Sequence, residues 1–254
     1  MKQEQGTKTY WVSLDILSWE VFPECGAVFE DSHGLLGHPY HLLRHAEDKL
    51  RGTPSELDLV DVITTLKRAA FHRKGAIDKH YALKHLPISG LPKDPLRRLA
   101  FFGIVKPIVL DTLVDIRNSI EHSNGRPPGL ERCKEMVEFV WYFLRSTDPH
   151  IRSIPDTYIL GTDETDDPKG YWTHIHTGPS NNWKIETRGW LPDSMITISE
   201  KAGSCLVEGN LQRAKDLPRT KKRHRSPEDA FINGKVLGPR DELIRLYRHY
   251  FSQA

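Results

Sequence analysis

A change of hydrophobic pattern near residue 150 constrains the fold of this chain more than any other feature. Before that point, apolar residues recur at intervals of three and four, which is the period of helices packed in a bundle. From residue 156 to 208, short runs rich in β-branched and aromatic residues alternate with Gly, Pro, Asn and Asp, which is typical of short antiparallel strands. We therefore expect an α+β chain in which a helical bundle is followed by a small antiparallel β-region.

The first part of the chain is expected to be a helical domain over residues 1–150. Its clearest start signal is Pro54 and Ser55, followed by the acidic residues Glu56 and Asp58. The opening stretch YWVSLDILSWEVF is apolar but of ambiguous period, and this interpretation counts it with the helical domain. The expected helices cover residues 38–52, 54–86, 94–105, 106–122 and 128–146.

Two further regions are expected after the helical domain. A small β-rich region over 151–212 contains the stretches TYILG, YWTHIHTG, WKIETRGW, MITIS and CLVEG. Residues 213–254 then form a basic linker, over 213–227, and a closing amphipathic helix, over 239–253.

The charge balance and cysteine content exclude several classes of protein. Lys and Arg number 36 against 34 Asp and Glu, so only local clusters of basic residues can argue for nucleic-acid binding. The three cysteines are widely separated, which argues against a disulfide framework or a cysteine-based zinc site. The amino terminus lacks a signal-peptide pattern, and no apolar stretch approaches the ~20 residues that a bilayer demands. We expect a cytoplasmic protein without a membrane partner.

The stretch DIRNSIEHSNGRPP, residues 115–128, ends one expected helix with a group of polar residues. A structural interpretation is available, because Arg117 can pair with Glu121 one turn later and His122 can cap the negative end of the helix dipole. On an ideal helix Arg117 and His122 point ~140° apart, so one straight helix does not bring them to one site. A twofold axis can supply the missing groups from a second subunit.

This helix end, a short polar loop and the following helix LERCKEMVEFVWYFL together resemble the HEPN superfamily. The HEPN signature is an Arg, usually followed by a polar residue such as Asn, and a His after four intervening residues; Arg117, Asn118 and His122 match it. The resemblance covers about residues 1–150, with recognisable sequence in 105–146. It implies a HEPN-like helical bundle that works as a homodimer. Many members of the superfamily are metal-independent endoribonucleases that act as toxins or in antiviral defence.

The resemblance also implies a role for each matching residue. The 2′-hydroxyl of RNA is an internal nucleophile, so cleavage needs positioning and proton transfer more than a metal or a cofactor. His122 would take or deliver a proton, and Arg117 would hold the phosphate and stabilise the charge of the transition state. Asn118 would orient His122 or contact the phosphate. The implied products are a 2′,3′-cyclic phosphate and a 5′-hydroxyl.

Other members of the superfamily bind or assemble without catalysis. The alternative function is therefore a HEPN-like dimerisation or adaptor module that binds nucleic acid or a protein partner. An antitoxin or a defence-system protein is the expected partner besides RNA.

The basic segment from Arg213 to Arg225 holds seven Lys and Arg against one acid, Asp216. Basic residues at this density can bind successive phosphates along an RNA strand, although a solvated linker explains the segment equally well. The candidate RNA contacts are Arg219, Lys221, Lys222, Arg223 and Arg225.

Two groups of histidines have both a functional and a structural interpretation. His38, His41 and His45 lie on one face of a helix at a spacing compatible with a metal, but that face lacks an obvious carboxylate. The preferred interpretation is therefore that they are ordinary histidines on a helix surface. His174 and His176 share one face of a strand, where they can bind a ligand or a phosphate or simply be solvated. A metal-dependent hydrolase that uses these histidines is the weakest alternative.

A group of tryptophans is open to two interpretations as well. Trp172, Trp183 and Trp190, with Lys184 and Arg188, can form a stacking and cationic surface for single-stranded nucleic acid. Tryptophans in a small sheet more often fill its core.

Overall fold

The computed structural model describes residues 8–24, 26–28, 34, 36–122, 126–162, 170–218 and 225–253. The chain divides into two compact units. The first, here called the sheet unit, comprises Met1–Ala27, His85–Leu91 and Pro155–Gln253. The second, the helical unit, comprises Val28–Lys84 and Pro92–Ile154, so it is inserted into the sequence of the sheet unit.

The helical unit contains every helix that the periodicity predicts for residues 38–146, with ends displaced by a few residues, and one further short helix. The helices are α1 (Gly37–Lys49), α2 (Glu56–Tyr81), α3 (Pro95–Phe101), α4 (Ile108–His122), α5 (Leu130–Thr147) and α6 (Pro149–Arg152). None of the helices in the described part of the chain has the length and apolar character that crossing a bilayer requires.

Local capping sets the ends of α2. The Ser55 hydroxyl accepts a hydrogen bond from the Asp58 amide, while the Asp58 carboxylate accepts one from the Ser55 amide. This reciprocal capping box satisfies two amides that the first turn leaves without partners. The helix ends where Ala82 adopts a left-handed conformation and its amide bonds to the Asp78 carbonyl.

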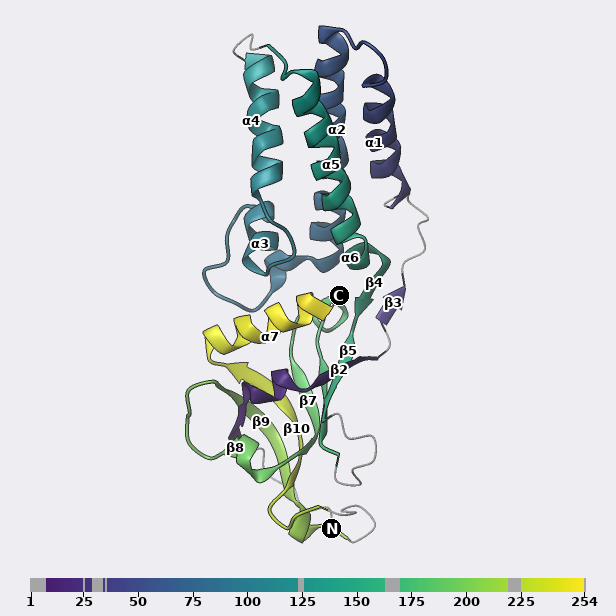
Figure 1. Ribbon diagram of the computed structural model, residues 1–254. Coiled ribbons are helices and arrows are strands. Elements are labelled where there is room, and N and C mark those ends of the chain that lie inside the picture. The colour runs from purple at the N-terminus through teal and green to yellow at the C-terminus, as the bar shows by residue number, and fades with distance from the viewer. Residues whose placement is uncertain are drawn as a thin grey trace. The chain divides into compact units, whose positions relative to one another are not determined.

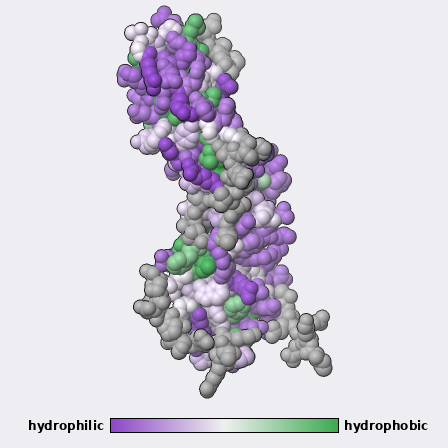
Figure 2. Space-filling model, turned by 90° about the vertical axis from the view of Figure 1, so that its right-hand side faces the viewer, coloured by the Kyte–Doolittle hydropathy of each residue, from purple (hydrophilic) through white to green (hydrophobic). Residues whose placement is uncertain are grey.

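Helix α2 is the centre of the helical unit, because it packs against α1, α4 and α5 (Figure 1). Its buried face includes Val62, Ile63, Leu66, Ala69 and Ile77, which recur at helical spacing. On the side where α1 lies, the exposed surface of the helical unit is mostly hydrophilic (Figure 2).

The sheet unit is built on an eight-stranded antiparallel sheet with the strand order β2-β5-β6-β7-β10-β9-β1-β8. Its strands are β1 (Lys8–Ser13), β2 (Glu20–Pro23), β5 (Thr157–Gly161), β6 (Trp172–His176), β7 (Glu186–Leu191), β8 (Ile196–Thr197), β9 (Ser204–Arg213) and β10 (Ala230–Gly238). The short strands β3 (Gly26–Val28) and β4 (Ser153–Pro155) form a separate pair.

The predicted arrangement of a helical bundle followed by a small β-region is therefore wrong. The sheet makes up much of the C-terminal half and also takes β1 and β2 from the stretch that was assigned to the helical domain. Strand β10 was missed because Asn233, Gly234 and Lys235 interrupt its apolar pattern. Gly234 is required there, because a Cβ would lie 2.7 Å from the Glu208 carbonyl oxygen on β9.

One face of this sheet carries the core of the sheet unit. Helix α7 (Arg240–Gln253), which corresponds to the closing helix expected over 239–253, packs on β9 and β10 (Figure 1). Its side chains Ile244, Tyr247, Tyr250 and Phe251 are buried. The sheet contributes buried residues that alternate along its strands, among them Val12, Tyr158, Ile175, Val207 and Ile232.

Candidate functional site

The motif residues Arg117, Asn118 and His122 all lie on α4, near its C-terminal end. The backbone is helical through His122, so the positions of Arg117 and His122 are ~140° apart around the helix axis. Asn118 is half-buried. The side chains of Arg117 and His122 lie outside the described part of the structure, so their roles remain predictions.

The end of α4 lies at the same end of the helical unit where α2 and α5 begin (Figure 1). The first turn of α5 is preceded by Gly129, and no side chain caps its amides. Free amides and the helix dipole make such a terminus favourable for an anion. Arg126, in the connection that leads to α5, is exposed.

Of the five candidate RNA contacts in the basic segment, only Arg225 lies among the described residues; Arg219, Lys221, Lys222 and Arg223 fall outside them. The Arg225 guanidinium donates to the Gly170 carbonyl oxygen at 2.7 Å. It also lies 5.0 Å from the ring centre of Tyr171 and 5.1 Å from that of Trp190. The end of the basic segment is therefore held against the sheet.

A second group of polar side chains lies on the face of the sheet opposite its buried core. These side chains occupy the positions that alternate with the buried residues along each strand. On β6 the side chains of Trp172, His174 and His176 are half-buried, while the intervening Thr173 and Ile175 are buried. The neighbouring strand β7 brings cross-strand partners to this face. The partner pairs are Trp172 with Trp190, His174 with Arg188, and His176 with Glu186.

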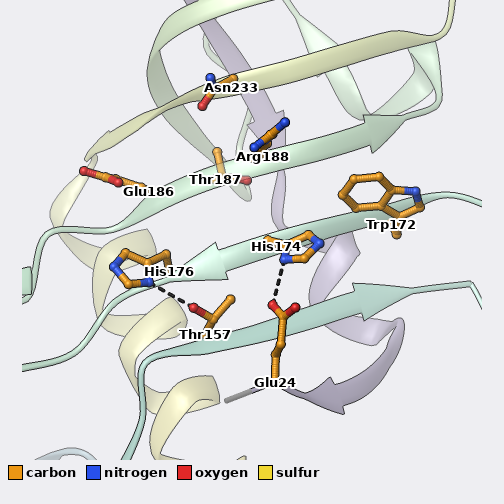
Figure 3. Close-up of a pocket in the computed structure, with 9 residues that line it drawn as sticks. All are labelled: Glu24, Thr157, Trp172, His174, His176, Glu186, Thr187, Arg188 and Asn233. Carbon is orange, nitrogen blue, oxygen red and sulfur yellow. Dashed lines mark hydrogen bonds and ion pairs between the residues drawn. The ribbon is translucent and has the colours of Figure 1, made fainter. Parts of the chain in front are cut away.

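Each of these histidines is oriented by a hydrogen bond at Nδ1. The Nδ1 atom of His174 lies 2.9 Å from a carboxylate oxygen of Glu24, and that of His176 lies 2.9 Å from the hydroxyl of Thr157. Figure 3 shows both contacts, with the second ring nitrogen of each histidine pointing away from its partner. Among the described residues, neither Nε2 atom makes a hydrogen bond.

The histidines belong to a hollow of about 600 Å³ on this face. It is lined by Glu24, Thr157, Trp172, His174, His176, Glu186, Thr187, Arg188 and Asn233 (Figure 3). The exposed Arg188 guanidinium lies 5.7 Å from the ring centre of Phe231, and within the described ranges no carboxylate forms an ion pair with it. The hollow thus combines one unpaired cation, two oriented imidazoles and an indole.

Sequence reasoning found some of these residues and missed others. The period of two along β6 indicated that His174 and His176 share a face, and Trp172 and Arg188 were candidates for a stacking surface. Glu24 and Thr157 were missed, because only strand pairing brings them beside the histidines. Pairing between distant segments leaves no local signal in the sequence.

The tryptophans considered together in the sequence separate in the structure. Trp183 is 1 % exposed and contacts the rings of Tyr247, Tyr250 and Phe251, so it belongs to the core. Trp190 is also buried. Only Trp172 of the three contributes to the lining of the hollow.

The histidines of α1 make separate contacts. His38 lies against the ring of His72, His41 contacts Arg44, and His45 pairs with Asp61 on α2 at 3.0 Å. Within the part of the chain that the structure describes, no group of three or more His, Cys, Asp or Glu side chains is arranged to hold a metal ion.

Comparisons of the chain with protein families, with curated proteins and with solved structures found no match.

Proposed function

We propose that the chain is a HEPN-like, metal-independent endoribonuclease of the cytoplasm that acts as a toxin or as an effector of antiviral defence. The observation that carries the proposal is that Arg117, Asn118 and His122 lie on one continuous helix, α4, which packs in a helical bundle and is followed by the long helix α5. The resemblance of the sequence to HEPN proteins rests on the same residues and the same order of helices.

The surroundings of this helix end support an anionic substrate. The uncapped first turn of α5 lies at the same end of the helical unit as the C-terminal end of α4 (Figure 1). The N-terminus of α5 carries a partial positive charge, whereas the capped first turn of α2 already holds the carboxylates of Glu56 and Asp58. A phosphodiester bound beside His122 is therefore stabilised by the backbone as well as by Arg117.

The chemistry follows from the structure of RNA. The 2′-hydroxyl oxygen attacks the adjacent phosphorus and loses its proton, while the bond from phosphorus to the 5′-oxygen breaks and that oxygen gains a proton. His122 takes or delivers one of these protons, since imidazole titrates near neutral pH. Arg117 stabilises the extra negative charge on the phosphate oxygens. The products are a 2′,3′-cyclic phosphate and a 5′-hydroxyl.

The angular separation of Arg117 and His122 on α4 favours a homodimer. Positions ~140° apart on one helix do not face the same phosphate, whereas a twofold axis beside the helix ends can combine groups from two subunits. The active cleft in this proposal is shared.

Incubation of the purified protein with a labelled RNA in EDTA tests the proposal. We expect cleavage that yields a 2′,3′-cyclic phosphate and that fails when the scissile nucleotide lacks its 2′-hydroxyl. His122→Ala should lower the rate by about 10²–10⁴, and Arg117→Ala by about 10²–10³.

Matched controls are available on exposed helix surfaces of the same unit. His41→Ala and Arg68→Ala remove an exposed imidazole and an exposed guanidinium from α1 and α2. Both should leave the rate unchanged. An absence of cleavage, or cleavage that His122→Ala does not alter, would remove the proposal.

One observation favours a second candidate, a HEPN-like module for dimerisation without catalysis. In the described part of the helical unit several large apolar side chains are exposed, among them Ile108 by 71 %, Phe139 by 41 % and Tyr142 by 64 %. Phe139 and Tyr142 also line a hollow beside α5 of about 340 Å³. If this is the function, Tyr142→Ser changes the mass measured by light scattering, and Arg117→Ala changes no chemical rate.

A further inference from the structure

The hollow on the open face of the sheet is not used by the proposed ribonuclease mechanism. It combines an indole, two imidazoles and a guanidinium on adjacent strands (Figure 3). We propose that this hollow is a separate binding site for single-stranded nucleic acid, with a phosphate held by Arg188, His174 and His176 and a base stacked against Trp172. The inference does not rest on the chemistry proposed for α4.

The cationic side of the site can hold a phosphodiester. His174 and Arg188 are direct cross-strand partners, so their Cβ atoms are about 5 Å apart. His174 and His176 are two residues apart on β6, which separates their Cα atoms by about 7 Å. Three nitrogen-bearing side chains on two adjacent strands thus line the same hollow, and the guanidinium among them makes no ion pair with any described carboxylate.

The orientation of the histidines suits a ligand that offers both acceptors and donors. The Glu24 carboxylate and the Thr157 hydroxyl occupy the two Nδ1 atoms, so the Nε2 atoms are the ones available to the hollow. A protonated ring donates from Nε2 to a phosphate oxygen, and a neutral ring with its proton on Nδ1 accepts there from a hydroxyl group.

The aromatic side of the site can bind an unpaired base. Trp172 lies next to His174, with 5.0 Å between the ring centres, and meets Phe231 edge to face at 6.4 Å. Base stacking on such a side chain tolerates any sequence but requires a base that is free of its own stack. The site therefore selects single strands over duplexes.

The end of the basic segment adds positive charge beside this site. Arg225 lies against Trp190, which is the cross-strand partner of Trp172. A strand that passes over Trp172 is therefore close to a further cation. Salt-dependent binding is expected from this arrangement.

Two carboxylates of the lining oppose a polyanion, and one of them gives a test of the ligand's charge. Glu24 is bonded to His174, whereas Glu186, the cross-strand partner of His176, is exposed. Glu186→Gln should leave the affinity for a single strand unchanged or raise it. A loss of affinity for the single strand in this variant would contradict the phosphate contact proposed for this hollow.

The test uses the whole 254-residue chain carrying His122→Ala, in EDTA, with fluorescent 12-nucleotide oligo-U and oligo-dT and a duplex of the same length as probes. We expect both single strands to bind more tightly than the duplex, and the ratio of their affinities reports any preference for RNA. Trp172→Ala should weaken single-strand binding roughly 5- to 150-fold, whereas Trp172→Tyr should retain most of it. Arg188→Gln should reduce the slope of log affinity against log salt by about 0.7.

Matched controls separate the hollow from the rest of the unit. Trp11 on β1 is half-buried and does not line the hollow, and Arg245 on α7 is exposed; Trp11→Ala and Arg245→Gln should change the affinity less than twofold. Circular dichroism and the melting temperature confirm that each variant is folded.

Three results would overturn the inference: equal binding of the duplex, equal effects of Trp172→Ala and Trp11→Ala, or an affinity that depends on Lys221, Lys222 and Arg223 but not on Trp172. Binding without cleavage by the wild-type chain would remove only the proposed ribonuclease activity. Cleavage with no binding at the hollow would remove only this inference.

Discussion

Arg73 and Asp148 form an ion pair inside the helical unit, with 2.7 Å between Nη1 and Oδ1. The Arg73 side chain is 0 % exposed and that of Asp148 is 9 % exposed. The same Nη1 donates to the Leu144 carbonyl and the Thr147 hydroxyl, and the Tyr40 hydroxyl donates to the second carboxylate oxygen. This network joins α1 and α2 to the end of α5.

Removal of one partner should destabilise the helical unit strongly. Asp148→Asn leaves the buried charge of Arg73 without a counterion, and Arg73→Ala leaves the buried Asp148 carboxylate without its cation. For either variant we expect the free energy of unfolding to fall by about 3–5 kcal/mol. Urea unfolding followed by circular dichroism measures it.

The exposed pair of Arg97 and Asp111 is the matched control for this prediction. Its atoms are 2.9 Å apart, but the side chains are 52 % and 38 % exposed. Arg97→Ala should cost at most about 1 kcal/mol, because solvent screens the pair. Equal losses at the two sites would contradict the role given to the buried pair.

The helices of the helical unit could be predicted because their signals are local. The apolar spacing of a helix repeats within a few turns, and the capping pattern that starts α2 involves only Ser55 and Asp58, which are three positions apart. The motif on α4 could be found for the same reason, since Arg117, Asn118 and His122 are neighbours in one helix.

The sheet could not be predicted to the same extent, because its order depends on pairing between distant segments. Glu24 and His174 are 150 positions apart, and they meet only because β2 pairs with β5 and β5 with β6. The strand pattern indicates which residues share a face but not which strand lies next to which. The sequence therefore indicated several of the lining residues separately, but not that they line one hollow.

Trp183 and Trp172 should respond very differently to truncation, although the sequence alone does not separate them. Trp183→Ala removes a side chain packed among Tyr247, Tyr250 and Phe251, so we expect a loss of about 3–5 kcal/mol from the free energy of unfolding. Trp172 is half-buried on the other face, so Trp172→Ala should cost less. Chemical unfolding of the two variants provides the comparison, and a larger loss in Trp172→Ala would contradict these assignments.

His150 should make the helical unit less stable in mild acid. Burial beside Tyr81 lowers the pKa of His150 from 6.5 to about 4. Between these two values the unfolded chain binds a proton at His150 that the folded chain does not. The contribution of His150 to the free energy of unfolding should therefore fall by up to about 3 kcal/mol as the pH is lowered from 6.5 to 4, and this contribution should change no further at lower pH.

The variant His150→Gln tests this pH dependence, because an amide does not titrate. Urea unfolding at several pH values between 4 and 7 should show a shallower loss of stability than in the wild type. Part of the slope should persist, because burial also lowers the pKa values of His72 and His80. Identical slopes in the variant and the wild type would contradict the assignment to His150.

Gly189 and Gly75 should respond to alanine with opposite signs. Gly189 lies on β7, where a Cβ would be 2.1 Å from the Trp172 carbonyl oxygen and 2.4 Å from the Thr173 Cα. Because both atoms belong to the backbone of β6, Gly189→Ala must push the strands apart, and we expect a loss of about 1–3 kcal/mol or more. Gly75 lies within α2 and a Cβ there meets no atom within 4 Å, so Gly75→Ala should gain about 0.5–1 kcal/mol. Thermal unfolding of the two variants measures both effects, and a neutral Gly189→Ala would mean that β6 and β7 do not approach each other as closely as described.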